Sequence, residues 1–512
     1  MNRQVAGVLV ALALLVGGYG VARYVASSSR TPGAAQQRAA AGARMRAKAK
    51  GKMKAAKAKR GKAKGKPGKG GAAVEAKALA PIVAGPARQP LTKGPPNVVL
   101  IIGCTMRADQ VTPYGGHPRT TPFLASRAEE GVLFESGVSA APWTKAASTA
   151  IVTGHHAAEV GMVEPSGLPS RRVLPDEVDT LAELFEKAGY QTFGVTANPN
   201  LNEVFGFGQG FEGYLEGTEL WRLGGRSKVN GRQLLGRAMP MLAELRDPER
   251  PFYGQFLFTD AHGPSTVKPL EVAPYEDGGS RAVAEYRAML HRLDMSVQVL
   301  EGSLAHQGIT RENTIFVMVS DHGEGLGEPS YNDHGHGRFT YPATVRMPWI
   351  VWGQGVAEGH RVSGVASQID VMPTLTALAG VQGYSGDGRS WAAAVRGETD
   401  HTDRQQAFVD TWFDDVRRSG VYTADRHCHD DWENVIDGEG NRRVPRACYT
   451  SDAELVPVED ARSEKLLADL SAFHVQMDTA FAKYPHTKDI EPNDDVKEEL
   501  QSLGYVARDP EE

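Results

Sequence analysis

The sequence predicts an α/β protein with a mostly parallel central sheet flanked by helices on both faces, followed by a smaller C-terminal α+β subdomain. Short runs of consecutive apolar residues, such as 98–102 and 315–319, are typical of strands that are buried on both faces of a parallel sheet. Between residues 98 and 380 such runs alternate with helical segments, which is the pattern of βαβ units. From about residue 397 onward the segments become shorter and more polar, which predicts the second subdomain.

The individual elements follow from apolar periodicity and from capping residues. We expect strands at residues 98–102, 133–139, 191–196, 252–259, 315–319 and 347–352. Helices are expected to open near residue 120 and to cover 144–153, 180–189, 282–307 and 369–380. Gly154 and Gly189 end two of these helices, as expected for a left-handed C-terminal cap.

The N-terminal part differs in charge from the rest of the 512 residues. Residues 1–74 hold 17 of the 57 Lys and Arg residues and no Asp or Glu, so the remainder carries 40 basic and all 62 acidic residues. An apolar run at 5–22 predicts that residues 1–30 are a signal peptide or membrane anchor. Residues 31–94 then form a basic, disordered Ala/Gly/Lys-rich linker, either a solvated tether or a segment that binds anionic lipid or another polyanion.

The remaining chain divides into a catalytic domain at 95–396 and a C-terminal subdomain at 397–512. Cys428 and Cys448 lie in one polar, loop-like stretch, and a disulfide between them fits an oxidising compartment. The competing interpretation is a metal site at Cys428 with its two flanking histidines, but that spacing alone is a weak signal. The positive charge after the apolar run by itself favours a cytoplasmic body. The expected disulfide, together with the family resemblance given below, instead favours an inner-membrane-anchored or exported protein whose body faces the periplasm or the cell exterior.

Polar residues with catalytic chemistry follow several of the predicted strands. Asp321 and His322 come directly after a buried strand, and such a pair is a common source of two ligands for one divalent cation. Cys104 and His262 follow two other strands, and the ends of parallel strands meet at one edge of a sheet. Thr144 opens a helix, where its hydroxyl could attack or hold an anion; the alternative is that Thr144 is only an N-cap.

Several motifs follow one another in order along the chain: 103–109 with 114–115, the T-P-x-L at 121–124, 143–154, S-D-H-G-E at 320–324, His336-Gly337 with Tyr341, R-x-P at 346–348, 370–380 and 500–506. Together these motifs resemble those of the sulfatase family, in the alkaline-phosphatase-like superfamily. The resemblance covers most of residues 96–506 and implies the fold of that family. It is greatest to bacterial members whose first strand runs into a V-D-T-L-R-A-D segment.

The resemblance also implies roles for individual residues. Thr144 falls at the nucleophile position, and Asp321 and His322 fall on metal ligands. His262 matches the histidine of the H-x-P loop, and His336 matches a cationic or general-acid position beside the ester. The remaining matches are the anion contacts Arg107 and Lys145.

Other positions depart from the family pattern. Cys104 stands where the family has a metal-binding Asp, and Ala146 and Ser148 replace the Pro and Arg of C-x-P-S-R, so no formylglycine is made at Thr144. Four ligands, Thr144, Asp321, His322 and Cys104, would hold one divalent metal ion. A Cys104 thiolate favours zinc, whereas calcium, magnesium or manganese fits a site without it.

Together these features predict a metal-dependent hydrolase of sulfate or phosphate esters that uses Thr144 as nucleophile or metal-activated hydroxyl. Its substrate would be an anionic ester of a glycan, a lipid headgroup or a small molecule, and no specific nucleic-acid partner is expected. One alternative is a transferase that moves a phosphoryl headgroup onto envelope glycans or lipids, similar to threonine-dependent lipoteichoic acid synthase and phosphoethanolamine transferases. The other is an inactive sulfatase-like binding protein.

Overall fold

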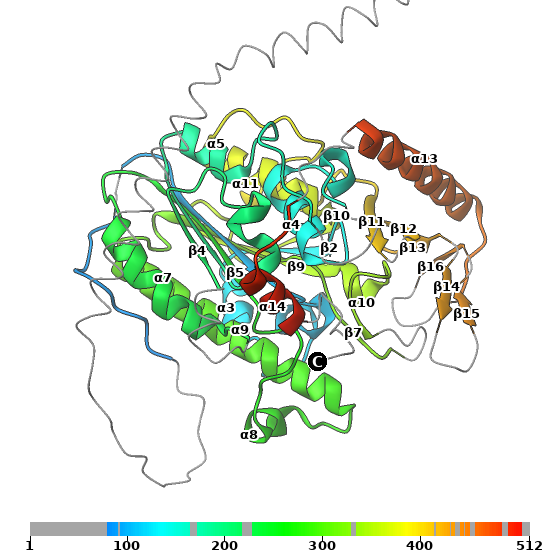
Figure 1. Cartoon of the computed structure of the whole chain (residues 1–512), viewed down its shortest axis with the longest axis horizontal. Coiled ribbons are helices and arrows are strands. Elements are labelled where there is room, and N and C mark those ends of the chain that lie inside the picture. The colour runs from blue at the N-terminus through cyan, green and yellow to red at the C-terminus, as the bar shows by residue number, and fades with distance from the viewer. Residues whose placement is uncertain are drawn as a thin grey trace, which may run out of the picture. The chain divides into compact units, whose positions relative to one another are not determined.

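The computed structural model of the chain describes residues 79–90, 93–163, 171–217, 228–328, 334–413, 416–430, 432–435, 441–444, 446–450, 456–483 and 490–503. All of them belong to one compact unit, Glu75–Glu512. The largest sheet among these residues has eight strands in the order β10-β2-β9-β6-β1-β5-β3-β4 (Figure 1). Its strands are β1 Asn97–Gly103, β2 Val132–Val138, β3 Gln191–Thr196, β4 Gly213–Glu216, β5 Phe252–Phe258, β6 Thr314–Ser320, β9 Arg346–Gly353 and β10 His360–Ser367.

Most neighbouring strands of this sheet run parallel. β1 pairs in parallel with β5 and β6, β3 pairs in parallel with β4 and β5, and β10 pairs in parallel with β2. β9 is the exception, since it runs antiparallel to both β2 and β6. The predicted mostly parallel sheet is therefore confirmed.

Two layers of helices cover the sheet. One face packs against α3 Pro122–Glu129, α7 Gly231–Leu245 and α9 Arg281–His306, and the other against α4 Thr144–Thr153, α5 Leu181–Lys187 and α11 Val371–Ala379. The two sets lie on opposite sides of the sheet in Figure 1. The prediction of helices on both faces is confirmed.

The central strand β1 shows why its sequence is a continuous apolar run. Its alternate residues Val98, Leu100 and Ile102 point into the core on the α4 side of the sheet. Val99 and Ile101 point into the core on the α9 side. All five are fully buried, and each contributes about 1.5–3 kcal/mol through removal of apolar surface from water. A strand buried in this way has no polar face, so its sequence lacks the usual alternation.

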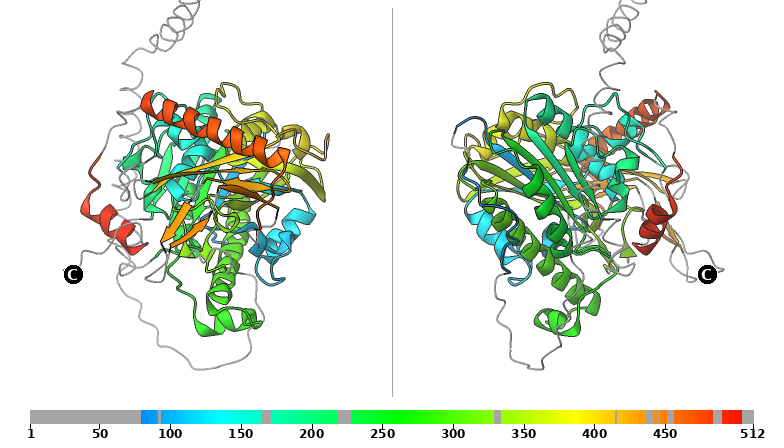
Figure 2. Two further views of the ribbon diagram at one scale, coloured as in Figure 1. Left: turned by 90° about the vertical axis from the view of Figure 1, so that its right-hand side faces the viewer. Right: turned by 60° about the vertical axis from the view of Figure 1, so that its left-hand side comes forward.

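The C-terminal region forms a separate antiparallel sheet of β11 Ala407–Phe413, β12 Val416–Tyr422, β13 His427–His429 and β16 Ala447–Tyr449. The long helix α13 Ala461–Lys483 lies across these strands, as Figure 2 shows. This arrangement confirms the predicted smaller C-terminal subdomain. The two short two-stranded sheets are β7 Gly325–Leu326 with β8 His334–Gly335, and β14 Trp432–Val435 with β15 Asn441–Val444.

The remaining helices among the described residues are short. The α-helices are α8 Pro269–Val272, α10 Pro342–Val345, α12 Ala392–Val395 and α14 Asp494–Ser502. The 3-10 helices are η1 Ala108–Gln110, η2 Thr112–Tyr114, η3 Ala157–Val160, η4 Pro199–Leu201, η5 Glu203–Phe205, η6 Ala273–Tyr275 and η7 Gln368–Asp370.

The predicted disulfide is confirmed, because Cys428 and Cys448 are bonded to each other. The stretch that holds them is not simply a loop, however. The two cysteines face each other as partners on the neighbouring strands β13 and β16, and both are buried. Strands of three residues are too short to produce a recognisable alternating pattern.

The N-terminal predictions fall largely outside the described residues. None of the helices that the structure describes has the length and apolar character needed to cross a bilayer, and the candidate segment at 5–22 is not among them. Residues 79–90, at the end of the predicted linker, lie against α9, where the Ile82 amide donates to the Ser303 hydroxyl at 2.8 Å. Residues 79–90 of the predicted linker therefore contact the folded body, and the predicted domain boundaries stay predictions.

Candidate active site

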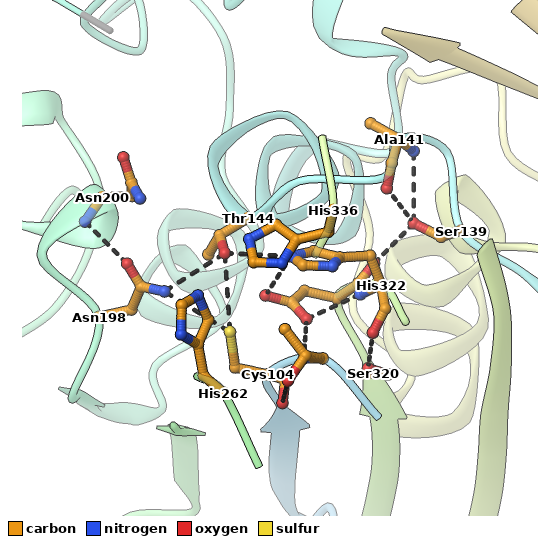
Figure 3. A network of polar contacts seen from close by, with 12 residues as sticks. Cys104, Ser139, Ala141, Thr144, Asn198, Asn200, His262, Ser320, His322 and His336 are labelled. Carbon is orange, nitrogen blue, oxygen red and sulfur yellow. Dashed lines mark hydrogen bonds and ion pairs between the residues drawn. The ribbon is translucent and has the colours of Figure 1, made fainter. Parts of the chain in front are cut away.

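The candidate residues meet at the carboxyl edge of the three central strands. In the sheet register Gly103 of β1 lies beside Ser320 of β6 and Phe258 of β5, so the residues that follow each strand emerge together. Figure 3 shows the resulting group of side chains, which point toward one another from separate segments. Its labelled members include Cys104, Thr144, Asn198, His262, His322 and His336.

The Thr144 hydroxyl lies at the centre of this group. Its Oγ1 is 3.6 Å from the Cys104 sulfur and 3.3 Å from His322 Nε2, and all three side chains are fully buried. Thr144 is the first residue of α4, and the extended Trp143 before it is the N-cap. The hydroxyl therefore lies at the positive end of the helix dipole, where a developing negative charge is stabilised.

The Asp321 carboxylate is held by only one of its two oxygens. Oδ1 accepts backbone hydrogen bonds from Thr105 at 2.9 Å and His322 at 2.7 Å. Oδ2 is buried and has no hydrogen-bond partner among the described residues. Thr105 turns its N–H toward the carboxylate by adopting a left-handed backbone with φ of 60°, which costs on the order of 1 kcal/mol or more in a non-glycine residue.

The His322 ring is fixed so that Nε2 faces the site. Nδ1 lies 2.8 Å from the Gly323 carbonyl oxygen, which can only accept, so the ring hydrogen is on Nδ1. Nε2 consequently carries a lone pair, 3.6 Å from Asp321 Oδ2. Burial lowers the pKa of His322, which favours this neutral form of the ring.

These atoms fit a divalent cation. Ligand atoms of Cys104, Asp321 and His322 all lie within 4.8 Å of one another. An unpartnered carboxylate oxygen in a buried site is costly unless a positive charge compensates it. Burial, and secondly the Asp321 carboxylate, raise the pKa of the Cys104 thiol well above its usual value, and a bound cation would oppose that shift.

His262 and His336 form the opposite wall of the site. The His336 ring centroid lies 4.5 Å from that of His322 and 4.9 Å from that of His262. Burial, together with the neighbouring His336, lowers the pKa of His262 well below its usual value. His336 Nδ1 also lies 3.1 Å from an oxygen of Glu324, the last residue of the S-D-H-G-E motif, to which the sequence assigned no role.

Asn198 is a second site residue that the sequence did not reveal. Its Oδ1 accepts the backbone N–H of Asn200 at 3.0 Å, which turns the amide nitrogen toward the site. Nδ2 then lies 3.3 Å from Thr144 Oγ1 and 3.6 Å from Cys104 Sγ. In sequence it belongs to an ordinary Asn-Pro turn after β3, and only the position after a strand could have drawn attention to it.

The two predicted anion contacts are placed less directly. The Arg107 guanidinium pairs with Asp109 at 2.8 Å and with Glu328, and both carboxylates compensate its charge. The Lys145 side chain is buried, with Nζ 3.4 Å from the centre of the Phe205 ring. Both residues are close to the site in the chain. In the structure, however, their charged groups contact protein side chains, namely two carboxylates for Arg107 and an aromatic ring for Lys145.

A lysine that was not predicted supports His262 instead. Lys228 Nζ donates to the carbonyl oxygen of His262 and to that of Asp260 at 3.0 Å. Burial lowers the pKa of Lys228 to about 8. Because Lys228 precedes His262 by 34 positions, no local pattern connects the two residues.

Comparison with known proteins supports a common family. The family model for sulfatases matches residues 96–381. The chain is 25% identical over 348 residues to the uncharacterized sulfatase YidJ of Escherichia coli (strain K12), covering 56% of this chain and 68% of that protein. It is 24% identical over 336 residues to N-acetylgalactosamine-6-sulfatase of Rattus norvegicus, covering 56% of this chain and 63% of that protein.

A solved structure shows the same fold. The phosphonate monoester hydrolase of Agrobacterium radiobacter superimposes with a TM-score of 0.57 at 16% identity, covering 75% of this chain and 96% of that one. The sulfatase model covers more than half of the chain and includes the segments that carry Cys104, Thr144, Asp321 and His322. The chain therefore belongs to the sulfatase family of ester hydrolases, within the alkaline-phosphatase-like superfamily.

Proposed function

We propose that the protein is a metal-dependent hydrolase of sulfate or phosphate esters in which Thr144 is the nucleophile. The observation that supports this most is the position of the Thr144 hydroxyl, at a helix N-terminus and within 3.6 Å of Cys104 Sγ, His322 Nε2 and Asn198 Nδ2. A buried hydroxyl among that many polar groups is well placed for attack on an anionic ester.

The metal would be held by Asp321, His322 and Cys104, with Thr144 as a further ligand. When bound, a divalent cation supplies Lewis-acid stabilisation and lowers the pKa of the nucleophilic hydroxyl. We favour zinc because the donors comprise one carboxylate, one imidazole and one thiol. If Cys104 stays protonated, the site is poorer in ligands, and calcium, magnesium or manganese then becomes the alternative.

The protein residues would divide the reaction between them. Thr144 Oγ1 would release its proton to water and form a bond to the sulfur or phosphorus atom while the bond to the leaving oxygen breaks. A second water molecule would then attack the same atom, break its bond to Oγ1 and return a proton to that oxygen, which frees the sulfate or phosphate anion. Asn198 Nδ2 is placed to donate to an equatorial oxygen of the ester. His336, with His262 beside it, would supply a proton to the leaving oxygen.

The neutral donor beside the nucleophile is a reason to test esters with a single negative charge first. Asn198 is a neutral donor, and the nearby Arg107 is already paired with two carboxylates. A sulfate monoester or a phosphate diester carries one negative charge, whereas a phosphate monoester carries nearly two at neutral pH. The rat relative is named for a sulfate ester on an amino sugar, so sulfated glycans are the first substrates to test.

The experiment is an ester-hydrolysis assay with the purified protein. Aryl sulfate, aryl phosphate monoester and aryl phosphate diester would each be tested after loading with zinc, calcium, magnesium or manganese. We expect turnover of a singly charged ester and its loss in Thr144→Ala. Thr149→Ala is the matched control, because Thr149 is buried on the same helix and its hydroxyl donates to the Lys145 carbonyl oxygen at 2.8 Å. Unchanged turnover in Thr144→Ala would remove Thr144 from the mechanism.

Transfer to an alcohol remains the second candidate, because an unmodified threonine at this position resembles threonine-dependent headgroup transferases. Hydrolysis and transfer differ only in the acceptor of the second step. We expect turnover with water as sole acceptor if the protein is a hydrolase. Turnover only after a glycan or lipid alcohol is added would favour the transferase. Absence of turnover under every metal and acceptor would favour a binding protein.

A further inference from the structure

The Glu324 carboxylate lies against a ring nitrogen of His336. Glu324 immediately precedes β7, and His336 immediately follows β8; these two strands pair with each other, with Gly325 opposite Gly335. The pairing brings two residues that are 12 positions apart to a distance of 3.1 Å between Glu324 Oε1 and His336 Nδ1. Both side chains are mostly buried, with exposed fractions of 11% and 13%.

We propose that Glu324 is a positioning residue that acts through His336. This inference rests on the proposed function, in which His336 serves the leaving oxygen of the ester. Because a carboxylate only accepts hydrogen bonds, His336 Nδ1 must donate, and the ring is then oriented with Nε2 directed away from Glu324. The centre of the His336 ring lies 4.5 Å from that of His322, a proposed metal ligand, and 4.9 Å from that of His262.

The backbone of Glu324 is held on both sides, so the carboxylate has little freedom. Its N–H donates to the Ala343 carbonyl at 3.0 Å, and its own carbonyl accepts from Arg107 Nη1 at 3.1 Å. Arg107 in turn is fixed by its ion pairs with Asp109 and Glu328. This gives Arg107 a role in the site other than anion binding, since it holds the segment that orients His336.

Two features distinguish this contact from an ordinary surface ion pair. It is largely excluded from water, which strengthens a charge-assisted hydrogen bond, and it ends on a ring that contacts another site residue. The chain also contains a comparison pair on its surface. His401 Nδ1 lies at the same 3.1 Å from Asp400 Oδ1, but the two side chains have exposed fractions of 65% and 84%.

The test is a double-mutant cycle on whichever ester the wild-type protein hydrolyses, with Glu324→Ala, His336→Asn and the double variant. We expect Glu324→Ala to lower kcat by about 10- to 100-fold with little change in KM, because general acid-base groups contribute roughly 10²- to 10⁴-fold. The double variant should be no slower than His336→Asn, and Glu324→Gln should recover part of the loss because its amide oxygen accepts the same hydrogen bond. Asp400→Asn, the matched control, should leave kcat unchanged.

The proposal would be overturned if the fold-losses in kcat of the two single variants multiplied in the double variant. It would also be overturned if Glu324→Ala lowered protein stability and left kcat unchanged. A second measurement does not depend on turnover. In protein labelled with ¹⁵N-histidine, we expect a hydrogen-bonded Nδ1–H signal from His336 that disappears in Glu324→Ala and persists in Asp400→Asn. If this signal behaves as expected while no ester is hydrolysed, the proposed function fails and the positioning contact stands. If the signal is absent from the wild type, the contact itself is refuted.

Discussion

The Cys104 sulfur lies 3.6 Å from the Thr144 hydroxyl oxygen, and both side chains are fully buried. The contact joins the end of the central strand β1 to the start of α4. In the proposed metal site, a thiol in this place would make the set of donor atoms a mixture of sulfur, nitrogen and oxygen. If the proposed site binds a metal, its preference should depend on Cys104, and this is the first prediction.

We predict that Cys104→Asp shifts metal preference from zinc toward calcium, magnesium or manganese. A carboxylate replaces the soft sulfur donor, and hard cations prefer oxygen ligands. Metal content after dialysis against an equimolar mixture of ions, followed by activity in each single metal, measures the shift. Cys104→Ala is the companion variant and should bind zinc more weakly without gaining calcium. Equal zinc content in all three proteins would show that Cys104 is not a ligand.

The oxygen of Asp321 that has no hydrogen-bond partner among the described residues leads to a prediction about stability. The difference in unfolding free energy between Asp321→Asn and the wild type should change sign when metal is added. In metal-free protein Asp321→Asn removes a buried carboxylate oxygen that has no hydrogen-bond partner among the described residues, so the variant should be more stable than the wild type by about 1–3 kcal/mol. With metal present the order should reverse, because the wild type gains binding free energy that the variant loses. Thermal unfolding with and without a chelator tests this. A variant that is less stable under both conditions would contradict the role of Asp321 as a ligand.

Asn198 is predicted to act on the reacting group. Asn198→Ala should lower kcat by about 100-fold, the usual loss for one donor to a developing negative charge, with a smaller change in KM. Asn198→Asp should be slower still, since it places a negative charge beside an anionic ester. Asn230→Ala provides the comparison, because Asn230 caps α7 and its loss costs about 1 kcal/mol of stability only. If both alanine variants keep wild-type kcat, Asn198 has no part in catalysis.

His156 is predicted to make the fold sensitive to acid. Burial lowers its pKa from 6.5 to about 4, and Nδ1 has no hydrogen-bond partner among the described residues. Between pH 6.5 and 4 the unfolded chain binds a proton that the folded chain does not, so this group makes stability fall as pH falls through that window.

The test replaces the histidine with an aromatic ring that cannot titrate. His156→Phe should retain the edge-to-face packing on Phe473 and lose less stability between pH 7 and 4.5 than the wild type. Denaturant unfolding at several pH values measures the difference. The exposed His401→Phe is the control and should follow the wild-type profile. Parallel profiles for His156→Phe and wild type would refute the assignment.

The central part of the fold was predictable because its signals are local. Strands β1 and β6 are buried on both faces, so their sequences are unbroken apolar runs, and Gly154 ends α4 in the left-handed conformation at φ 69°. The disulfide was also predictable, since few cysteines were available to pair. In contrast, the short strands β13 and β16 give too few residues for a periodic signal, and α7 was not predicted.

The sequence by itself determined the family and the fold class, and it identified Thr144, Asp321 and His322 as candidate site residues. This was possible because these residues lie in contiguous motifs beside strong strand and helix signals. Only the tertiary structure decided which groups complete the site. Asn198 and Lys228 come from segments far from the motifs, the contact of Glu324 with His336 joins the ends of two separate strands, and the Arg107 guanidinium pairs with carboxylates. The physical reason is that hydrogen-bond geometry at a sheet edge depends on how separate loops pack against one another, and no local pattern in the chain encodes that packing.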